Sequence, residues 1–89
     1  MPSREVEIIN KLGLHARAAA KLVTLATSFE STIQVARGDK QVPGNSIMAV
    51  MMLAAAKGTR LTITAEGSDA EQALDALEAL VNNRFDEEQ

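Results

Sequence analysis

Hydrophobic and polar residues alternate near the start of the chain and then change to a helical spacing. Val6 and Ile8 alternate with two glutamates, which is the period of a strand with one buried face. From Ala16 onward, apolar positions recur three, four and seven residues apart, which predicts an amphipathic helix. The apolar positions of this helix are Leu22, Leu25, Ala26 and Phe29.

Strand-like alternation returns twice later in the chain. It predicts a strand over 32–37, a turn at Gly38-Asp39 and a returning strand from residue 40 that ends at Pro43-Gly44. A last strand is predicted over 61–65.

A run from Ile47 to Ala56 predicts a second helix, with capping oxygens supplied by Asn45 and Ser46. This helix is apolar on every side, and a small domain with helices on one sheet face cannot bury a helix all round. We therefore expect its large apolar side chains to be partly exposed. These are Ile47, Met48, Met51 and Met52.

A third helix is predicted to begin at Ser68, which forms a capping box with Glu71. It would bury Ala70, Leu74, Leu77 and Val81, end near Asn82-Asn83 and be followed by a solvated acidic tail over 86–89. The order of elements is strand, helix, strand, strand, helix, strand, helix. One-sided strands need helices on a single face, so the sequence predicts a two-layer α+β domain.

Composition limits the possible functions. The 89 residues suffice for a single domain over 1–89 and leave little volume for a deep pocket. Cysteine is absent, which excludes disulfides and thiolate metal sites. We expect a cytoplasmic protein, because the first residues contain no apolar signal core and the longest apolar run is too short to span a bilayer.

Charge is unevenly distributed along the chain. Residues 1–40 carry six Lys/Arg and four Asp/Glu, whereas residues 41–89 carry three and eight, within a net charge of −3. This acidic balance and the presence of only two aromatic residues argue against nucleic-acid binding.

His15, the only histidine, is the candidate reactive residue. A lone histidine is more often a solvated or hydrogen-bonded side chain, but this one lies at the start of the first predicted helix. Free backbone N–H groups and the helix dipole favour an anion there and favour the neutral, nucleophilic imidazole. Arg17 is placed to share the charge of a phosphoryl group, although a solvent-facing helix residue is an equal alternative.

The sequence lacks motifs with which the protein could bind ATP and phosphorylate itself. The sequence has no Walker-type glycine loop and no second histidine. We therefore expect no cofactor and no metal, and we expect the phosphoryl group to come from another protein.

Two separated motifs carry a resemblance to a known family. The run Gly13 to Arg17 with Ala19 to Leu22, followed by Asn45 to Met48 and Met51 to Ala54, strongly resembles HPr. HPr is the phosphocarrier of the bacterial phosphoenolpyruvate-dependent phosphotransferase system. The resemblance covers essentially the whole chain and implies an open-faced sandwich in which three helices cover a four-stranded antiparallel sheet.

The resemblance also implies roles for residues. His15 would be phosphorylated on Nδ1 by enzyme I and pass the group to EIIA-type domains, and Arg17 matches the arginine of the phosphorylation site. This protein would be a monomeric carrier acted on by enzymes rather than an enzyme. The implied docking face consists of Ala16, Ala20, Ile47, Met48 and Met51.

Ser46 matches the serine that HPr kinase/phosphorylase modifies in many relatives, and a helix cap is the compatible structural interpretation. Asn45 and Ala49 depart from the kinase-regulated pattern, in which Lys and Gly are frequent. Ala18 replaces the usual proline, for which we expect retained activity with slightly looser geometry. The Asn45-Ser46 pair, the Met51-Met52-Leu53 run and the ending Phe85-Asp86-Glu87 resemble the nitrogen-related branch, NPr, more than the sugar-transport branch.

Two other functions are compatible with the sequence. One is a noncatalytic regulatory module that docks partners through the second helix, with His15 silent. The other is a small enzyme of the ferredoxin-like type, which is poorly supported because the sequence offers no second catalytic group, and it would need a convergent pocket.

Overall fold

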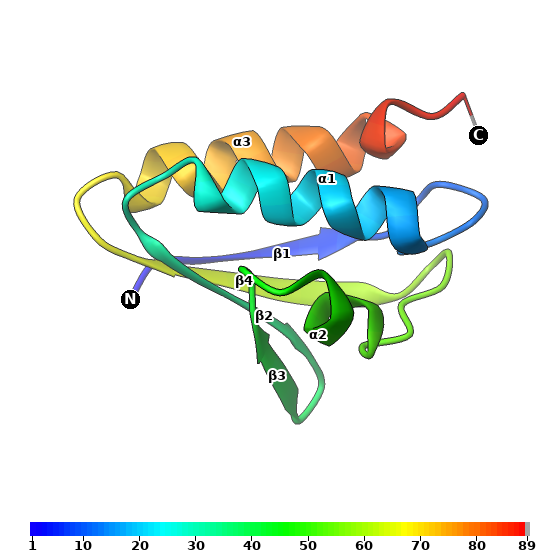
Figure 1. The fold of residues 1–89 in the computed structure, drawn as a ribbon, viewed down its shortest axis with the longest axis horizontal. Helices are drawn as coiled ribbons and strands as arrows, with labels where there is room; N and C mark the ends of the chain where they lie inside the picture. Colours follow the sequence, from blue (N-terminus) through cyan, green and yellow to red (C-terminus); the bar gives the residue numbers. More distant parts are fainter. Residues whose placement is uncertain (89) are drawn as a thin grey trace.

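The computed structural model describes residues 1–88. It contains four strands, three α-helices and a short 3-10 helix (Figure 1). In chain order they are β1 (Ser3–Glu7), α1 (Ala16–Thr27), β2 (Thr32–Arg37), β3 (Lys40–Pro43), α2 (Ile47–Met51), β4 (Arg60–Glu66), α3 (Ala70–Asn82) and η1 (Arg84–Asp86).

The strands form one antiparallel sheet in the order β1-β4-β2-β3. Ile63 of β4 lies opposite Val35 of β2, and Leu61 lies opposite Val6 of β1. These four side chains are buried, while the residues between them point away from the core. The alternation in the sequence therefore marks the inner face of the sheet correctly.

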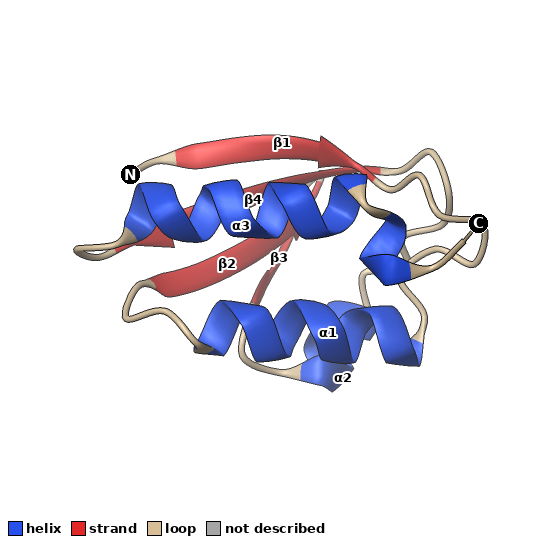
Figure 2. Cartoon of the chain, turned by 90° about the horizontal axis from the view of Figure 1, so that it is seen from above, coloured by secondary structure: helices blue, strands red, loops and turns tan. Residues whose placement is uncertain are grey.

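The helices cover one face of this sheet, and the opposite face is open (Figures 1 and 2). The predicted two-layer α+β open-faced sandwich is confirmed. Helix α1 contributes Ala18, Ala19, Leu22, Val23 and Ala26 to the core, and α3 contributes Ala70, Ala73, Leu74, Leu77 and Val81. Small alanines on the inner side of both helices let the backbones lie close to the sheet.

The prediction of a second helix extending to Ala56 is wrong, because α2 ends at Met51. Ala54 has a left-handed φ of 53°, and the carbonyl of Ala55 accepts a hydrogen bond from the N–H of Leu14 at 2.8 Å. A run of alanines has high helix propensity, but this tertiary bond and the burial of Ala55 favour a loop.

Two further local predictions are wrong. Phe29 lies beyond the end of α1, although it still packs against the core. Ser68 does not cap α3: Asp69 is the residue that precedes the helix, and the Ser68 hydroxyl donates to Glu30 at 3.1 Å. The Asp69 carboxylate is engaged by the neighbouring loop instead, accepting the backbone N–H groups of Glu30 and Ser31 at 2.9 Å each.

None of the helices among residues 1–88 is both long and apolar enough to cross a membrane.

Candidate functional site

His15 is the N-cap residue of α1. Its backbone is extended, with φ −76° and ψ −179°, and its carbonyl accepts the N–H of Ala19 at 2.8 Å. The imidazole makes no capping hydrogen bond, and its side chain is 28% exposed. The ring therefore lies at the helix start, as the sequence predicts, but makes no hydrogen bond that caps the helix.

The first turn of α1 presents backbone donors next to this ring. Helix geometry leaves the N–H groups of Ala16, Arg17 and Ala18 without a carbonyl partner inside the helix. No acidic side chain occupies the first turn. Ala18 also retains an N–H that a proline at that position would lack. The helix start therefore favours an added anion.

The loop before α1 is fixed by the loop that follows α2. Gly13 has a left-handed φ of 70°, and the next residue, Leu14, donates to the Ala55 carbonyl. A shallow depression of about 220 Å³ opens beside the ring. It is lined by Leu12, Leu14, His15, Ala54, Ala55 and Ala56. The candidate reactive side chain therefore lies in an open surface hollow rather than in an enclosed pocket.

The C-terminal segment returns to the N-terminal end of α1 (Figure 1). The prediction that this segment is a solvated tail is wrong for Glu87, whose side chain is only 16% exposed and contacts Nε2 of His15 through Oε2. Oε1 of the same carboxylate accepts a hydrogen bond from the buried Asn10 side chain at 2.9 Å. Gln89, the last residue of the predicted tail, lies outside the described residues.

Glu87 is a charged acceptor in this position. Burial raises the pKa of its carboxyl group, but the hydrogen bonds from Asn10 and His15 outweigh that effect and hold the pKa below its ordinary value. The carboxylate is therefore ionised at neutral pH.

A strained turn over residues 84–86 places Glu87 beside the imidazole of His15. Arg84, Phe85 and Asp86 all have left-handed φ values, between 52° and 65°, and each costs about 1–2 kcal/mol for a residue other than glycine. Two contacts offset this strain. Phe85 is fully buried, and its carbonyl accepts a hydrogen bond from the Lys21 ammonium group of α1 at 2.8 Å.

Arg17 is exposed on α1. Within residues 1–88 no carboxylate pairs with its guanidinium group. It lines a depression of about 400 Å³ with Lys11, Leu12, Lys21, Asp86, Glu87 and Glu88. Arg17 therefore lines the same depression as Glu87, and its positive charge is not paired with a carboxylate among residues 1–88. Residues 1–88 contain no cluster of histidine and acidic side chains suited to hold a metal ion.

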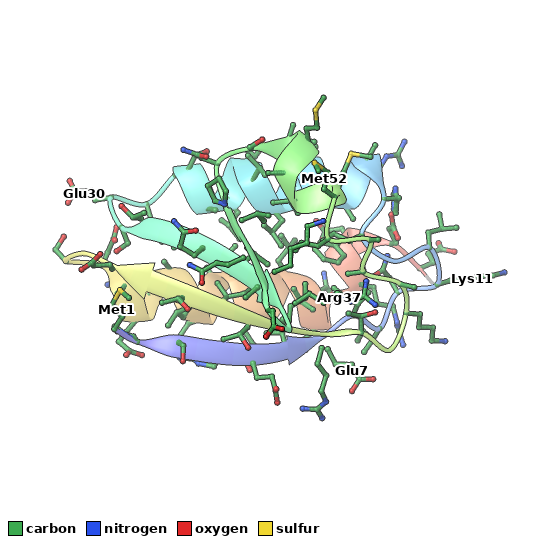
Figure 3. The ribbon with its side chains drawn as sticks, turned by 90° about the horizontal axis from the view of Figure 1, so that it is seen from below. Met1, Glu7, Lys11, Glu30, Arg37 and Met52 are labelled. Atoms are coloured by element: carbon green, nitrogen blue, oxygen red, sulfur yellow. The ribbon has the colours of Figure 1, made fainter. Side chains whose placement is uncertain are left out.

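The predicted exposure of the apolar side chains of α2 is confirmed. Met48 is 74% exposed and Met52 60%, while Ile47 and Met51 are each near 40%. These four side chains line a depression of about 550 Å³, and Figure 3 shows Met52 beside α2. Ala16 is exposed and Ala20 is half-buried on α1, which lies beside α2 (Figure 2).

Ser46 caps α2. Its hydroxyl accepts the N–H of Ala49 at 3.2 Å, as the capping prediction requires. The side chain is half-buried and directly precedes the exposed apolar residues of the helix.

Comparison with known proteins decides the family. Residues 2–83 match the family model described as "PTS HPr component phosphorylation site". The chain belongs to the HPr family. It is 57% identical over 88 residues to phosphocarrier protein HPr of Pseudomonas aeruginosa, covering 98% of both chains. It is 46% identical over 84 residues to phosphocarrier protein NPr of Shewanella violacea, covering 94% of this chain and 92% of that one.

Solved structures agree with the family. The crystal structure of HPr-C-His from Thermoanaerobacter tengcongensis superposes with a TM-score of 0.95 at 43% identity, and each chain is covered completely. This member of the HPr family is therefore a phosphocarrier of the phosphotransferase system rather than a catalytic enzyme.

Sequence reasoning missed Asn10 and Glu87. Glu87 was assigned to the solvated tail from local pattern alone, and Asn10 was not singled out. The contact between Glu87 and His15 spans 72 residues. The sequence signal that could have indicated a docked segment is Phe85, an aromatic residue just after α3, which the structure buries completely.

Proposed function

We propose that Nδ1 of His15 accepts a phosphoryl group from enzyme I and passes it to an EIIA-type domain. The observation that carries this proposal is the position of the ring at the start of α1, partly exposed and without a capping role. A partner can reach such a ring directly, and no enclosed pocket has to open first.

The chemistry follows from the residues around the ring. The Nδ1 lone pair attacks phosphorus while the bond between phosphorus and the donor breaks on the opposite side. The backbone N–H groups at the start of α1 and the guanidinium group of Arg17 share the added negative charge. Because the group stays at the surface, a second protein can remove it by the same in-line path.

Partners dock on the apolar surface beside this ring. The proposed docking face consists of Ala16, Ala20, Ile47, Met48 and Met51. Methionine side chains are flexible and polarizable, which suits a surface that fits enzyme I and an EIIA-type domain in turn. The exposure of Met48 supports this role, because an unpartnered apolar side chain is costly in water.

Ser46 is the proposed regulatory site, modified by HPr kinase/phosphorylase. A phosphate on its hydroxyl would meet the N-terminus of α2 while adding negative charge next to Ile47 and Met48. We further propose that the carrier is a cytoplasmic monomer of the nitrogen-related branch of the family.

Phosphoenolpyruvate, magnesium and enzyme I provide the test. We expect a phosphorylated species that is labile in acid and stable in base, and we expect the His15→Ala variant to remain unlabelled. Label retained by His15→Ala would refute the assignment. If His15→Ala instead performed every function in cells, a noncatalytic docking module would replace the carrier proposal.

A further inference from the structure

Glu87 is held differently from its acidic neighbours. Its side chain is 16% exposed, whereas that of Asp86 is 59% exposed and Glu88 is exposed. Its two carboxylate oxygens face two different residues, Asn10 and His15. The described residues thus fix Glu87 from both sides, and one of the two groups it contacts is the reactive ring.

The anchoring of Glu87 is independent of that contact. Asn10 is fully buried and also donates to the carbonyl of Gly13 at 2.8 Å, so its amide is fixed within the loop before α1. Buried Phe85 and the hydrogen bond from Lys21 hold the preceding turn. A strained, well-anchored turn next to a reactive side chain is typical of a functional element.

We propose that Glu87 is a positioning residue for phosphoryl transfer, holding a proton on Nε2 of His15 and balancing the charge of the phosphorylated ring. The carboxylate has only acceptor atoms, so the contact with Nε2 requires the proton to lie on Nε2. Nδ1 is then the ring nitrogen that presents a lone pair. This inference rests on the proposed phosphorylation of His15.

The transfer step balances without moving a proton. The neutral ring, protonated on Nε2, donates its Nδ1 lone pair to phosphorus, and the electron pair of the broken bond leaves with the donor. The phosphorylated ring keeps its Nε2 proton and carries a positive charge next to the Glu87 carboxylate. On transfer to the acceptor, the electron pair of the P–N bond returns to Nδ1, and the leaving group is a neutral imidazole rather than an imidazolate anion.

The first test measures the unphosphorylated protein, so it does not depend on the proposed function. Nitrogen-15 NMR at alkaline pH reports which ring nitrogen of His15 carries the proton. We expect the Nε2–H tautomer to predominate in the parent protein. The ratio of tautomers should fall about tenfold in Glu87→Ala, the loss expected for one hydrogen bond to a charged group.

Two further variants serve as comparisons for Glu87→Ala. In Glu87→Gln one of the two acceptor oxygens becomes an NH2 donor, although Asn10 and His15 both donate to this group, so one hydrogen bond is lost together with the charge and the tautomer ratio should fall in this variant as well. Glu88→Gln removes the same charge at an exposed neighbour and should change nothing. An unchanged tautomer ratio in Glu87→Ala would overturn the proposal.

The second test measures phosphoryl transfer from enzyme I, with folding of each variant checked by circular dichroism. We expect the transfer rate to fall about tenfold in Glu87→Ala and to fall in Glu87→Gln too, because the latter loses the charge balance and one of the two hydrogen bonds. If the tautomer shifts but the rate does not, the positioning role is wrong although His15 remains the acceptor. If the parent protein is never phosphorylated on His15, the proposed function fails, and with it the role of Glu87 in transfer. The tautomer measurement then still shows whether Glu87 holds the proton on Nε2.

Discussion

The backbone N–H of Leu14 donates to the carbonyl of Ala55 at 2.8 Å. Leu14 directly precedes His15, and Ala55 lies in the loop that follows α2. This hydrogen bond fixes the helix that carries the proposed phosphorylation site relative to the helix that carries the proposed docking face. A partner that recognises Met48 and Met51 is thereby placed at a defined position beside the imidazole.

Gly13 makes this connection possible. Its φ is +70°, and a Cβ atom there would lie 2.7 Å from the Ala55 carbonyl oxygen. We expect Gly13→Ala to lower the free energy of unfolding by about 1–3 kcal/mol, since it adds a clash to left-handed strain. Urea unfolding measures the change.

Gly38→Ala is the matched control. Gly38 also has a left-handed φ, of +58°, but an added Cβ would meet nothing within 4 Å. Gly38→Ala should lower the free energy of unfolding by about 1–2 kcal/mol, from backbone strain alone. Equal losses in the two variants would show that the loop can move aside at Gly13.

Met48→Glu tests the docking face. Because the Met48 side chain is 74% exposed, the substitution should change the free energy of unfolding by no more than about 0.5 kcal/mol. Its charge within an apolar contact should weaken binding to enzyme I by about tenfold or more, measured by calorimetry. Gln72→Glu adds the same charge on the exposed side of α3 and should bind normally. Unfolding of Met48→Glu would place Met48 in the core and remove the basis of the docking face.

Ser46 variants separate capping from regulation. Ser46→Ala removes the hydroxyl that accepts from Ala49, so it should cost about 1 kcal/mol of stability while transfer continues. Ser46→Asp keeps a capping oxygen and complements the helix dipole, so stability should be preserved. Its negative charge should slow phosphorylation of His15 severalfold in the enzyme I assay. A rate for Ser46→Asp equal to that of the parent protein would argue against regulation through charge at this position.

Asp69 predicts a pH dependence of stability. The Ser31 hydroxyl and the backbone N–H of Glu30 lower the pKa of its carboxyl group below the ordinary value of 3.8. A carboxyl group with a lowered folded-state pKa stabilises the fold fully above the unfolded-state pKa, and this contribution is lost as the pH falls through the folded-state pKa.

Asp69→Asn should therefore be less stable than the parent at neutral pH, and the difference should narrow as the pH falls below 3.8. Thermal unfolding across acidic pH measures this. Asp39→Asn, in the exposed turn between β2 and β3, is the control for removing a surface carboxylate. If the stability difference between Asp69→Asn and the parent stays constant with pH, the shape of the Asp69 side chain rather than its charge determines its contribution to stability.

Local periodicity predicts the fold well because β1, β2, β4 and both long helices bury one side of their own sequence pattern. Val35 and Ile63 mark the sheet face, and Leu22 and Leu74 mark the inner sides of the two long helices. The position of His15 is also predictable, since the change from strand to helical spacing occurs beside it.

Periodicity fails where a distant contact decides the conformation. The alanine run after α2 is a good helix sequence, but the hydrogen bond between Leu14 and Ala55 holds it as a loop. Glu87 belongs to an acidic segment whose composition is typical of a solvated tail. The burial of Phe85 and the contact with His15 hold Glu87 at the site instead. Neither partner is visible in the local sequence, which is why the contact between Glu87 and His15 was missed.

The most direct test of the central claim is to identify the phosphorylated nitrogen. Nitrogen-15 and phosphorus-31 NMR of the protein phosphorylated by enzyme I should show coupling between phosphorus and Nδ1 of His15, with the proton retained on Nε2. Phosphorus bonded to Nε2, the nitrogen that Glu87 contacts, or to a residue other than His15, would contradict the account.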